Sequence, residues 1–281
     1  MRFLNKIWTI TLLLFSLSAC IAFVYSPELS KLYGYDNSYI FFYKQLISLA
    51  IGVIIIFGLS KLNYKDWFNK VGAITLIISA LFMLLMQIVP PSGVATIQGV
   101  KTYLVFDGFA VSPMLFLFIG LIWLVSYVYS KKKNFKVIAV SVLVFVGGII
   151  IYLLTSPHRI ERIKTWLNTL SVTQTPQNAL HETLLLSIVD TIGIFGLVVT
   201  VGVFVGLFYI LIQKEYSAEI QKYFVIGVSF LIGFVLFVNI LYSFGLSPLA
   251  PTLYFIGYGT SAILSTSLMI GMLLMQDTKK I

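Results

Sequence analysis

The chain has 281 residues, of which 59% are hydrophobic and only 10% are charged, and its formal net charge is +9. Soluble domains carry about a quarter charged residues, so this composition excludes an ordinary soluble enzyme or binding module. The sequence instead predicts a single integral membrane domain over residues 1–281.

Eight apolar stretches have the length and composition of membrane-spanning helices, which need roughly 20 such residues each. In chain order they are Ile7–Tyr25, Gln45–Ser60, Val71–Val89, Val111–Tyr129, Val137–Thr155, Gly193–Ile212, Phe224–Phe244 and Leu253–Met275. The sequence therefore predicts an all-α polytopic membrane protein with about eight transmembrane helices.

The first stretch allows a second interpretation. Leu17–Cys20, "LSAC", fits the cleavage site of a bacterial lipoprotein signal behind a basic start and an apolar core. A polar linker normally follows such a cysteine, whereas Ile21–Tyr25 continue the apolar run. We therefore expect an uncleaved first helix, in which the chain's single cysteine has no disulfide partner and no metal-site neighbours.

Basic residues set the expected orientation, because cytoplasmic loops are enriched in Lys and Arg. With the N-terminus inside, 13 of the 19 lysines and arginines fall on inside segments. The six on outside segments are Lys31, Lys44, Lys101, Arg159, Arg162 and Lys164. Both termini are then cytoplasmic. The positive charge reflects topology, and it does not indicate nucleic-acid binding because no soluble basic domain is evident.

The longest outside segment, residues 156–183, combines apolar and charged residues at helical spacing around Trp166. This pattern predicts an amphipathic helix lying in the membrane interface. Its arginines, Arg159 and Arg162, have two possible roles. They can anchor the helix to lipid phosphate, or they can bind the phosphate of a lipid-linked substrate, for which Arg is geometrically suited.

Near the C-terminus, Ser247–Ala262 ("SPLAPTLYFIGYGTSA") places prolines, glycines and hydroxyl residues inside apolar sequence. Prolines stop or bend a helix, glycines allow close approach of another helix, and hydroxyls can satisfy the freed backbone groups. Irregular backbone at membrane depth does not face lipid. We call this segment the elbow. It is predicted to be either a packing kink or the wall of a cavity.

The outside loop before the fourth helix resembles a motif of the SEDS family of membrane proteins (FtsW, RodA and SpoVE). Gly99–Leu104 ("GVKTYL") aligns without a gap with the family's GARRWI, and Pro113 then falls on the proline of its QPSE motif. Lys101 stands at the first arginine and Tyr103 at the tryptophan, while Ser112 replaces the glutamine.

The elbow resembles the family's final motif, PxTGxPLPFISYGGSS. Pro248, Tyr258, Gly259 and Ser261 fall on matching positions of that motif. Gln45 also matches a Lys-Gln pair of the family's second helix, and further matches follow in order from about residue 8 to residue 276. The resemblance implies a SEDS-like fold with both termini inside.

Two departures from the family stand out. SEDS proteins usually have ten spans, and the helix pair that carries their QPDLGT-like segment is missing between the basic run at 131–136 and the outside segment. The family's HTDFIFA motif carries the aspartate regarded as its catalytic base, whereas His181 is followed here by Glu182 and Thr183. The stretch also aligns with the family's YQxxxSLxAIxxGGxxG segment, and neither register restores the aspartate.

The resemblance implies a role in bacterial cell-wall synthesis, at the inner (cytoplasmic) membrane. The family polymerises lipid II, which requires a carboxylate base and cations for the leaving pyrophosphate. Candidate carboxylates are Glu182, as a substitute base, then Asp107, Glu161 and Asp190. The predicted substrate groove contains Lys101, Tyr103, Arg159, Arg162, His181 and Asp190, and the candidate cations include Lys164.

Three functions remain open: a divergent peptidoglycan glycosyltransferase, a non-catalytic scaffold of a wall-synthesis complex, and a lipid or solute transporter. No internal symmetry of the kind many transporters show is visible. The resemblance implies a class B penicillin-binding protein as partner, for which small residues on Gly193–Gly206 and the fourth helix offer a face. We expect no cofactor, and His158 and His181 are too few for a convincing metal site.

Overall fold

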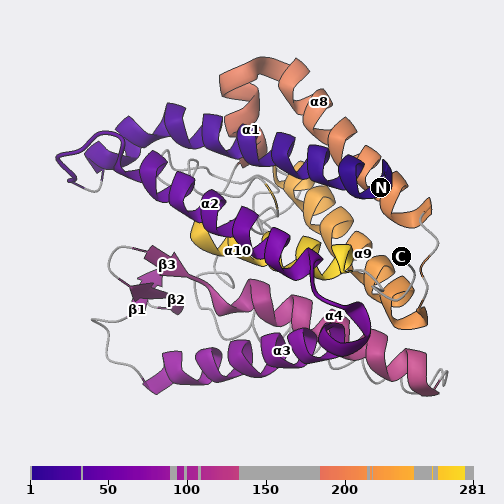
Figure 1. The fold of residues 1–281 in the computed structure, drawn as a ribbon. Helices are drawn as coiled ribbons and strands as arrows, with labels where there is room; N and C mark the ends of the chain where they lie inside the picture. Colours follow the sequence, from indigo (N-terminus) through magenta and orange to yellow (C-terminus); the bar gives the residue numbers. More distant parts are fainter. Residues whose placement is uncertain are drawn as a thin grey trace, which may run out of the picture.

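The computed structural model describes residues 2–32, 34–88, 94–97, 100–106, 109–132, 184–213, 216, 218–243, 255 and 259–275. Its helices are α1 (Arg2–Leu32), α2 (Ile40–Ser60), α3 (Tyr64–Ile88), α4 (Pro113–Lys132), α8 (Leu184–Gln213), α9 (Glu219–Ser243) and α10 (Thr260–Leu274). Between α3 and α4 lie β1 (Val94–Ile97), β2 (Val100–Phe106) and β3 (Phe109–Val111). These strands form a small sheet at one end of the helix bundle, which we call the sheet end (Figure 1).

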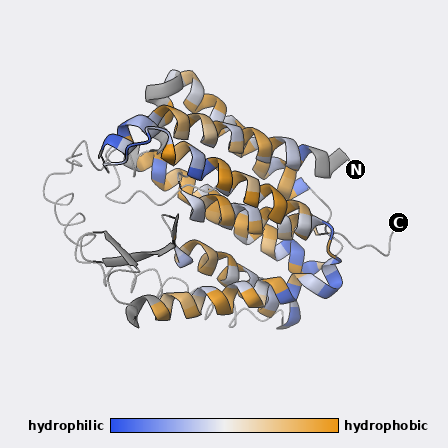
Figure 2. Ribbon diagram, turned by 60° about the vertical axis from the view of Figure 1, so that its left-hand side comes forward, coloured by the Kyte–Doolittle hydropathy of each residue, from blue (hydrophilic) through white to orange (hydrophobic). Residues whose placement is uncertain are grey.

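Six of the described helices are long and apolar enough to cross a membrane. Their apolar spans are Lys6–Lys31, Ile40–Ser60, Tyr64–Leu85, Pro113–Lys131, Phe195–Gln213 and Glu219–Leu241. Hydrophobic residues dominate the lengths of the helices, as Figure 2 shows. The predicted polytopic helical membrane fold is confirmed. The expected span Val137–Thr155 and the outside segment 156–183 lie outside the described residues, so the count of eight stays a prediction.

Several helices extend beyond the apolar stretches that predicted them. α1 continues past Tyr25 to Leu32, and α2 begins at Ile40 rather than at Gln45. Hydropathy detects the part of a helix that matches the hydrocarbon, whereas helical hydrogen bonding continues into more polar residues. α1 also runs uninterrupted through Cys20, whose thiol is free and exposed. The start of α1 and the end of α10 lie at the end of the bundle opposite the sheet (Figure 1).

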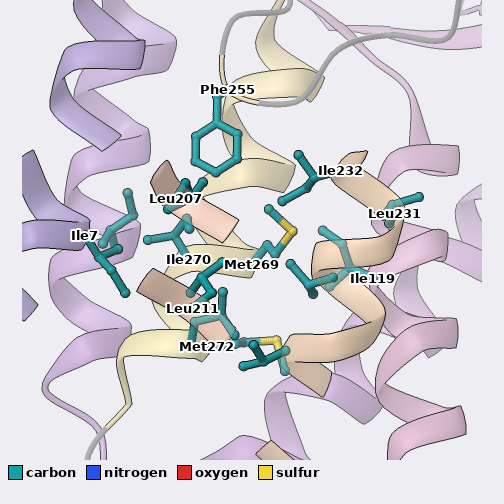
Figure 3. Packing of buried hydrophobic residues seen from close by; sticks show 14 of the residues in the cluster. Ile7, Ile119, Leu207, Leu211, Leu231, Ile232, Phe255, Met269, Ile270 and Met272 are labelled. Atoms are coloured by element: carbon teal, nitrogen blue, oxygen red, sulfur yellow. The ribbon is translucent and has the colours of Figure 1, made fainter. Parts of the chain in front are cut away.

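α10 occupies the centre of the bundle although it has only 15 residues. Nearly all of its side chains are buried. Figure 3 shows three of them, Met269, Ile270 and Met272, surrounded by side chains from several other helices. The surrounding residues are Ile7 of α1, Ile119 of α4, Leu207 and Leu211 of α8, and Leu231 and Ile232 of α9. α10 is therefore a core helix, enclosed by protein on most of its surface.

α2 packs along α10 through small residues on both helices. A Cβ atom added at Gly52 would collide with the Ser267 hydroxyl, and one added at Gly271 would lie 2.7 Å from Leu59 Cδ1. Lipid offers no hydrophobic driving force for helix association, so close van der Waals packing at such glycines stabilises helix pairs in membranes. The glycines of α2 and α10 thus bring two backbones together at the centre of the fold.

α3 and α4 form an antiparallel hairpin (Figure 1) that is packed in the same way. A Cβ atom at Gly72 would collide with the ring of Trp123, and one at Gly120 would lie 2.7 Å from Leu76 Cα. The Trp123 indole N–H also donates a hydrogen bond to Asn69 Oδ1 at 3.4 Å. This hairpin holds the segment that connects its two helices, which includes the three strands.

The three strands form an antiparallel sheet in the order β1-β2-β3. Val94 pairs with Leu104 across β1 and β2, and Leu104 pairs in turn with Val111 across β2 and β3. The register shifts between Ala95 and Thr96, as at a β-bulge. The sequence predicted an outside loop here and no strand, so the sheet is an addition to the predicted all-α fold.

α8 contains a break at Gly193, where φ is 77° and ψ is −177°. A positive φ of this kind is favourable only for glycine. The sequence placed the start of a span at Gly193, but the chain is already helical from Leu184. The break therefore divides α8 into a short first piece and a long apolar piece, Phe195–Gln213, that is able to span the membrane.

Candidate functional site

The elbow meets α2 through one buried glutamine. Gly259, with φ of 110°, donates its N–H to Gln45 Oε1 at 3.1 Å. The Gln45 amide group in turn donates to Ser18 Oγ of α1 at 2.6 Å, and the Gln45 side chain is only 2% exposed. A single amide side chain therefore connects α1, α2 and the residue that precedes α10.

Hydroxyl groups extend this contact to the outside loop. Ser48 Oγ of α2 lies 3.1 Å from Thr260 Oγ1. Ser261 Oγ accepts a hydrogen bond of 2.6 Å from the backbone N–H of Ser112, the residue between β3 and α4. The two stretches that carry the family resemblance lie 149 positions apart in sequence at this bond. The structure brings them together at the sheet end of the bundle.

Phe255 shows how the chain approaches α10. Its backbone is left-handed, with φ of 70°, and its side chain is fully buried. Its N–H donates to Thr266 Oγ1 at 2.9 Å. Thr266 lies six residues into α10 after Thr260, about 9 Å along the helix at 1.5 Å per residue. Phe255 therefore lies deep in the bundle, beside Thr266 in the second turn of α10.

The contacts of the elbow support its role as a packing kink. Two backbone N–H groups of the elbow, those of Phe255 and Gly259, donate to buried side chains, and Ser261 of the elbow accepts a bond from the N–H of Ser112. A buried backbone donor without a partner is costly in hydrocarbon, so these side chains stabilise the irregular backbone. Pro248 and Tyr258 lie outside the described residues, and the role of the elbow as a cavity wall stays a prediction.

The structure places some of the predicted groove residues and leaves others out. Lys101 and Tyr103 lie on β2, where they pair with Thr96 and Ala95 of β1. Asp190 lies in α8, six residues after Leu184 and three before the break at Gly193. The remaining predicted residues, Arg159, Arg162, Lys164, His181 and Glu182, lie outside the described residues. Convergence of these groups on one groove is therefore still a prediction.

Two residues of the sheet end were missed as site residues. Gln45 appeared only as a match to the family's second helix, yet an amide inside an apolar span is itself a signal that a buried partner is needed. Lys44 lies with its Nζ 5.1 Å from the centroid of the Tyr35 ring and 5.8 Å from that of Phe41. Its ammonium group is thus held by two aromatic rings at the start of α2.

No group of three His, Cys, Asp or Glu side chains in the described part of the chain is arranged to hold a metal ion. The nitrogen and oxygen atoms of Gln45 and of the neighbouring serines instead bond to one another and to the backbone. The described part of the sheet end is therefore a hydrogen-bonded junction of helices.

Comparisons with known proteins agree with this architecture. The family model for FtsW, RodA and SpoVE, described as a cell cycle protein, matches residues 5–136. A probable peptidoglycan glycosyltransferase FtsW from Helicobacter pylori is 25% identical over 352 aligned positions, which cover 86% of this chain and 90% of the relative. The alignment is longer than the chain itself, so the relative contains segments that are absent here. Stage V sporulation protein E of Bacillus subtilis is 26% identical over 126 residues, or 44% of this chain and 33% of that protein.

Solved structures share the fold over most of its length. The crystal structure of the Thermus thermophilus rod shape determining protein RodA matches with a TM-score of 0.64 and 17% identity, covering 94% of both chains. A chain from a structure described as a peptidoglycan synthase complex matches with a TM-score of 0.60 and 16% identity, covering 95% of this chain and 96% of that one. The chain is therefore similar to the SEDS family of FtsW, RodA and SpoVE in sequence over residues 5–136, and its two matching stretches meet at Ser112 and Ser261.

Proposed function

We propose that this protein acts in bacterial cell-wall synthesis, in cell shape or division, as a multi-pass protein of the cytoplasmic membrane. The observation that carries the proposal is the contact between the outside loop and the elbow, because it joins two separate matches to the family in one place. The names of the H. pylori and T. thermophilus relatives support a wall-synthesis role.

The proposed activity is transfer of a lipid-linked disaccharide onto a growing glycan. A hydroxyl of the acceptor sugar attacks the anomeric carbon of the donor, undecaprenyl pyrophosphate leaves, and the proton of the hydroxyl passes to a general base. Glu182 is our candidate for the base. Lys101, Arg159 and Arg162 are candidates to stabilise the negative charge of the leaving pyrophosphate. Lys101 lies on the sheet that Ser112 connects to α4.

The activity is tested with purified protein and lipid II, with and without its cognate class B penicillin-binding protein, by electrophoresis of the glycan products. We expect polymer from the wild type and its loss in Glu182→Ala. Asp36→Ala is the matched control, because it removes an exposed carboxylate just before α2 that is not a candidate base, and it is expected to retain polymer. Polymer that survives Glu182→Ala in folded protein would show that Glu182 is not the base.

A scaffold function is the second candidate, and a specific observation favours it. The aspartate that the family carries two residues after its histidine is absent after His181, and a misplacement of about 1 Å can lower a rate by about a hundredfold. A scaffold predicts no polymer from either the wild type or Glu182→Ala under any tested condition, together with recovery of wall-synthesis proteins by crosslinking in native membranes. Loss of polymer only in Glu182→Ala would exclude it.

We propose that the partner is a single-span class B penicillin-binding protein, which docks on α8. A Cβ atom at Gly202 or at Gly206 would meet no atom of the described residues within 4 Å, so the described part of the chain leaves this face of α8 open to another helix. In the fourth helix, Gly120 already packs against Leu76 of α3 and is not free to meet a partner. Bulky substitution of Gly206 is expected to weaken crosslinking to the partner.

A further inference from the structure

The segment between β3 and α4 consists of one residue, Ser112, which is the last residue before the Pro113 start of α4. Proline is suited to the first position of a helix because it needs no backbone partner there. The N–H of Ser112 does need one, since it precedes the helix and belongs to no strand pair. Its partner comes from another helix, as the hydroxyl of Ser261. The junction of sheet and helix is thus fixed by α10.

This bond also sets the position of the strand that carries the candidate cation. Val111, next to Ser112, pairs with Leu104 of β2, and Leu104 is the neighbour of Tyr103. Lys101 precedes Tyr103 by two residues on the same strand, opposite Thr96. Because paired strands move together, a displacement of Ser112 displaces β2.

The hydroxyl of Ser261 is itself held in place. Ser261 is only 5% exposed, and it lies two residues after Gly259, whose N–H is bound by Gln45. Thr260, between them, contacts Ser48 of α2. The acceptor for Ser112 is therefore anchored to the centre of the bundle through α2. The position of the sheet is thus fixed relative to the core of the bundle as well as relative to the α3–α4 hairpin.

We propose that Ser261 is a positioning residue, whose hydroxyl fixes the outside sheet and its Lys101 strand relative to the core of the bundle. The structural part of this proposal stands on the hydrogen bond and the strand register alone. Its kinetic part rests on the proposed glycosyl transfer, for which correct placement of Lys101 would govern binding of the lipid-linked donor.

The structural part is tested by hydrogen–deuterium exchange of the purified protein in lipid nanodiscs. Ser261→Ala leaves the Ser112 N–H without its acceptor, so we expect backbone amides of residues 94–112 to exchange roughly tenfold faster, as for the loss of a buried hydrogen bond. Ser261→Thr keeps a hydroxyl on the same carbon and is expected to retain slow exchange.

Ser265→Ala is the matched control. Ser265 is also buried on α10, but its hydroxyl donates to Ala262 within the same helix, at 3.2 Å. It should leave exchange in residues 94–112 unchanged. Equal exchange in Ser261→Ala and the wild type, or equal acceleration by both alanine variants, would overturn the proposal.

A second variant covers the case in which Ser261→Ala does not fold. Ser112→Pro removes the donor N–H from the other side of the bond. A residue that precedes proline already favours an extended backbone that proline can adopt, so this substitution suits position 112. It is expected to accelerate exchange in residues 94–106 in the same way. Unchanged exchange in folded Ser112→Pro would contradict the proposal.

The kinetic part is tested in the polymerisation assay. We expect Ser261→Ala to raise KM for the lipid-linked donor severalfold with a smaller change in kcat, whereas partial unfolding would lower the amount of active protein at constant KM. An unchanged KM would refute the kinetic part. If the wild type makes no polymer, the proposed glycosyl transfer fails, while the exchange experiment still decides whether Ser261 positions the sheet.

Discussion

Two closely packed helix pairs of the described structure use glycine differently. In the α3–α4 hairpin, Gly120 approaches the backbone of Leu76 and Gly72 faces the ring of Trp123. In the α2–α10 pair, Gly52 faces a hydroxyl and Gly271 faces the flexible side chain of Leu59, and the pair also carries the contacts of Gln45 and Ser48 with the elbow.

This difference separates two ways of holding helices together in lipid. The hairpin depends on shape, because a backbone atom opposite a glycine cannot move aside. The central pair depends on polar groups, which cannot hydrogen-bond to water inside the hydrocarbon and therefore need protein partners. Its hydrogen bonds thus specify which residues meet. Substitutions in the hairpin are therefore expected to cause a large loss of stability. Substitutions in the central pair are expected to cause smaller losses that depend on the residue changed.

The largest effect is expected for Gly120→Ala. The new methyl group would lie 2.7 Å from Leu76 Cα and 2.9 Å from its backbone nitrogen, so the hairpin must separate, at a cost of about 3 kcal/mol. Thermal unfolding in detergent measures the loss. Gly202→Ala is the control, since a Cβ there meets nothing within 4 Å among the residues that the structure describes, and it should lose no stability. Equal stability of the two variants would contradict the backbone clash.

A smaller loss of about 2 kcal/mol is expected for Gln45→Leu, because the N–H of Gly259 is left buried without an acceptor. The same unfolding measurement applies. Gln221→Leu is matched to it, since Gln221 is also buried but makes a longer bond of 3.5 Å to the carbonyl of Met275. We expect it to lose less stability than Gln45→Leu, and the reverse order would show that the Gln45 junction does not stabilise the bundle.

The smallest effect is expected for Gly271→Ala, at about 1 kcal/mol, because the atoms it meets belong to the side chain of Leu59, Cδ1 at 2.7 Å and Cβ at 2.8 Å, and none of them is a backbone atom. The double variant Gly271→Ala with Leu59→Ala should recover part of the loss, since the second change removes Leu59 Cδ1 and Cγ but keeps its Cβ. A loss as large as that of Gly120→Ala would mean that the central pair is as rigid as the hairpin.

Much of the fold was predictable because the bilayer imposes one dominant requirement. Long apolar stretches such as Phe224–Phe244 must be helices, since no other isolated segment satisfies its backbone in hydrocarbon. The non-helical backbone of Gly259, with φ of 110°, falls inside the predicted elbow, whose role as a packing kink or a cavity wall stays a prediction. Hydropathy could not give the helix ends, which depend on local hydrogen bonding outside the hydrocarbon.

The features that escaped prediction depend on contacts between distant residues. The short strands around Lys101 have no clear alternation, and their pairing depends on a register that no local pattern specifies. The bond between Ser112 and Ser261 joins a backbone group to a side chain 149 positions away. The break at Gly193, with φ of 77°, could be suspected from the glycine, but the helical residues before it could not be predicted from hydropathy.

The central position of α10 has a consequence for assembly in the cell. This helix follows in the chain all the helices that surround it in the structure, and it carries buried hydroxyls at Ser261, Ser265 and Thr266. Segments of a membrane protein enter the bilayer in the order of their synthesis. The earlier helices must therefore leave the position of α10 unfilled, with Gln45 and Ser48 facing it, until α10 is inserted between them.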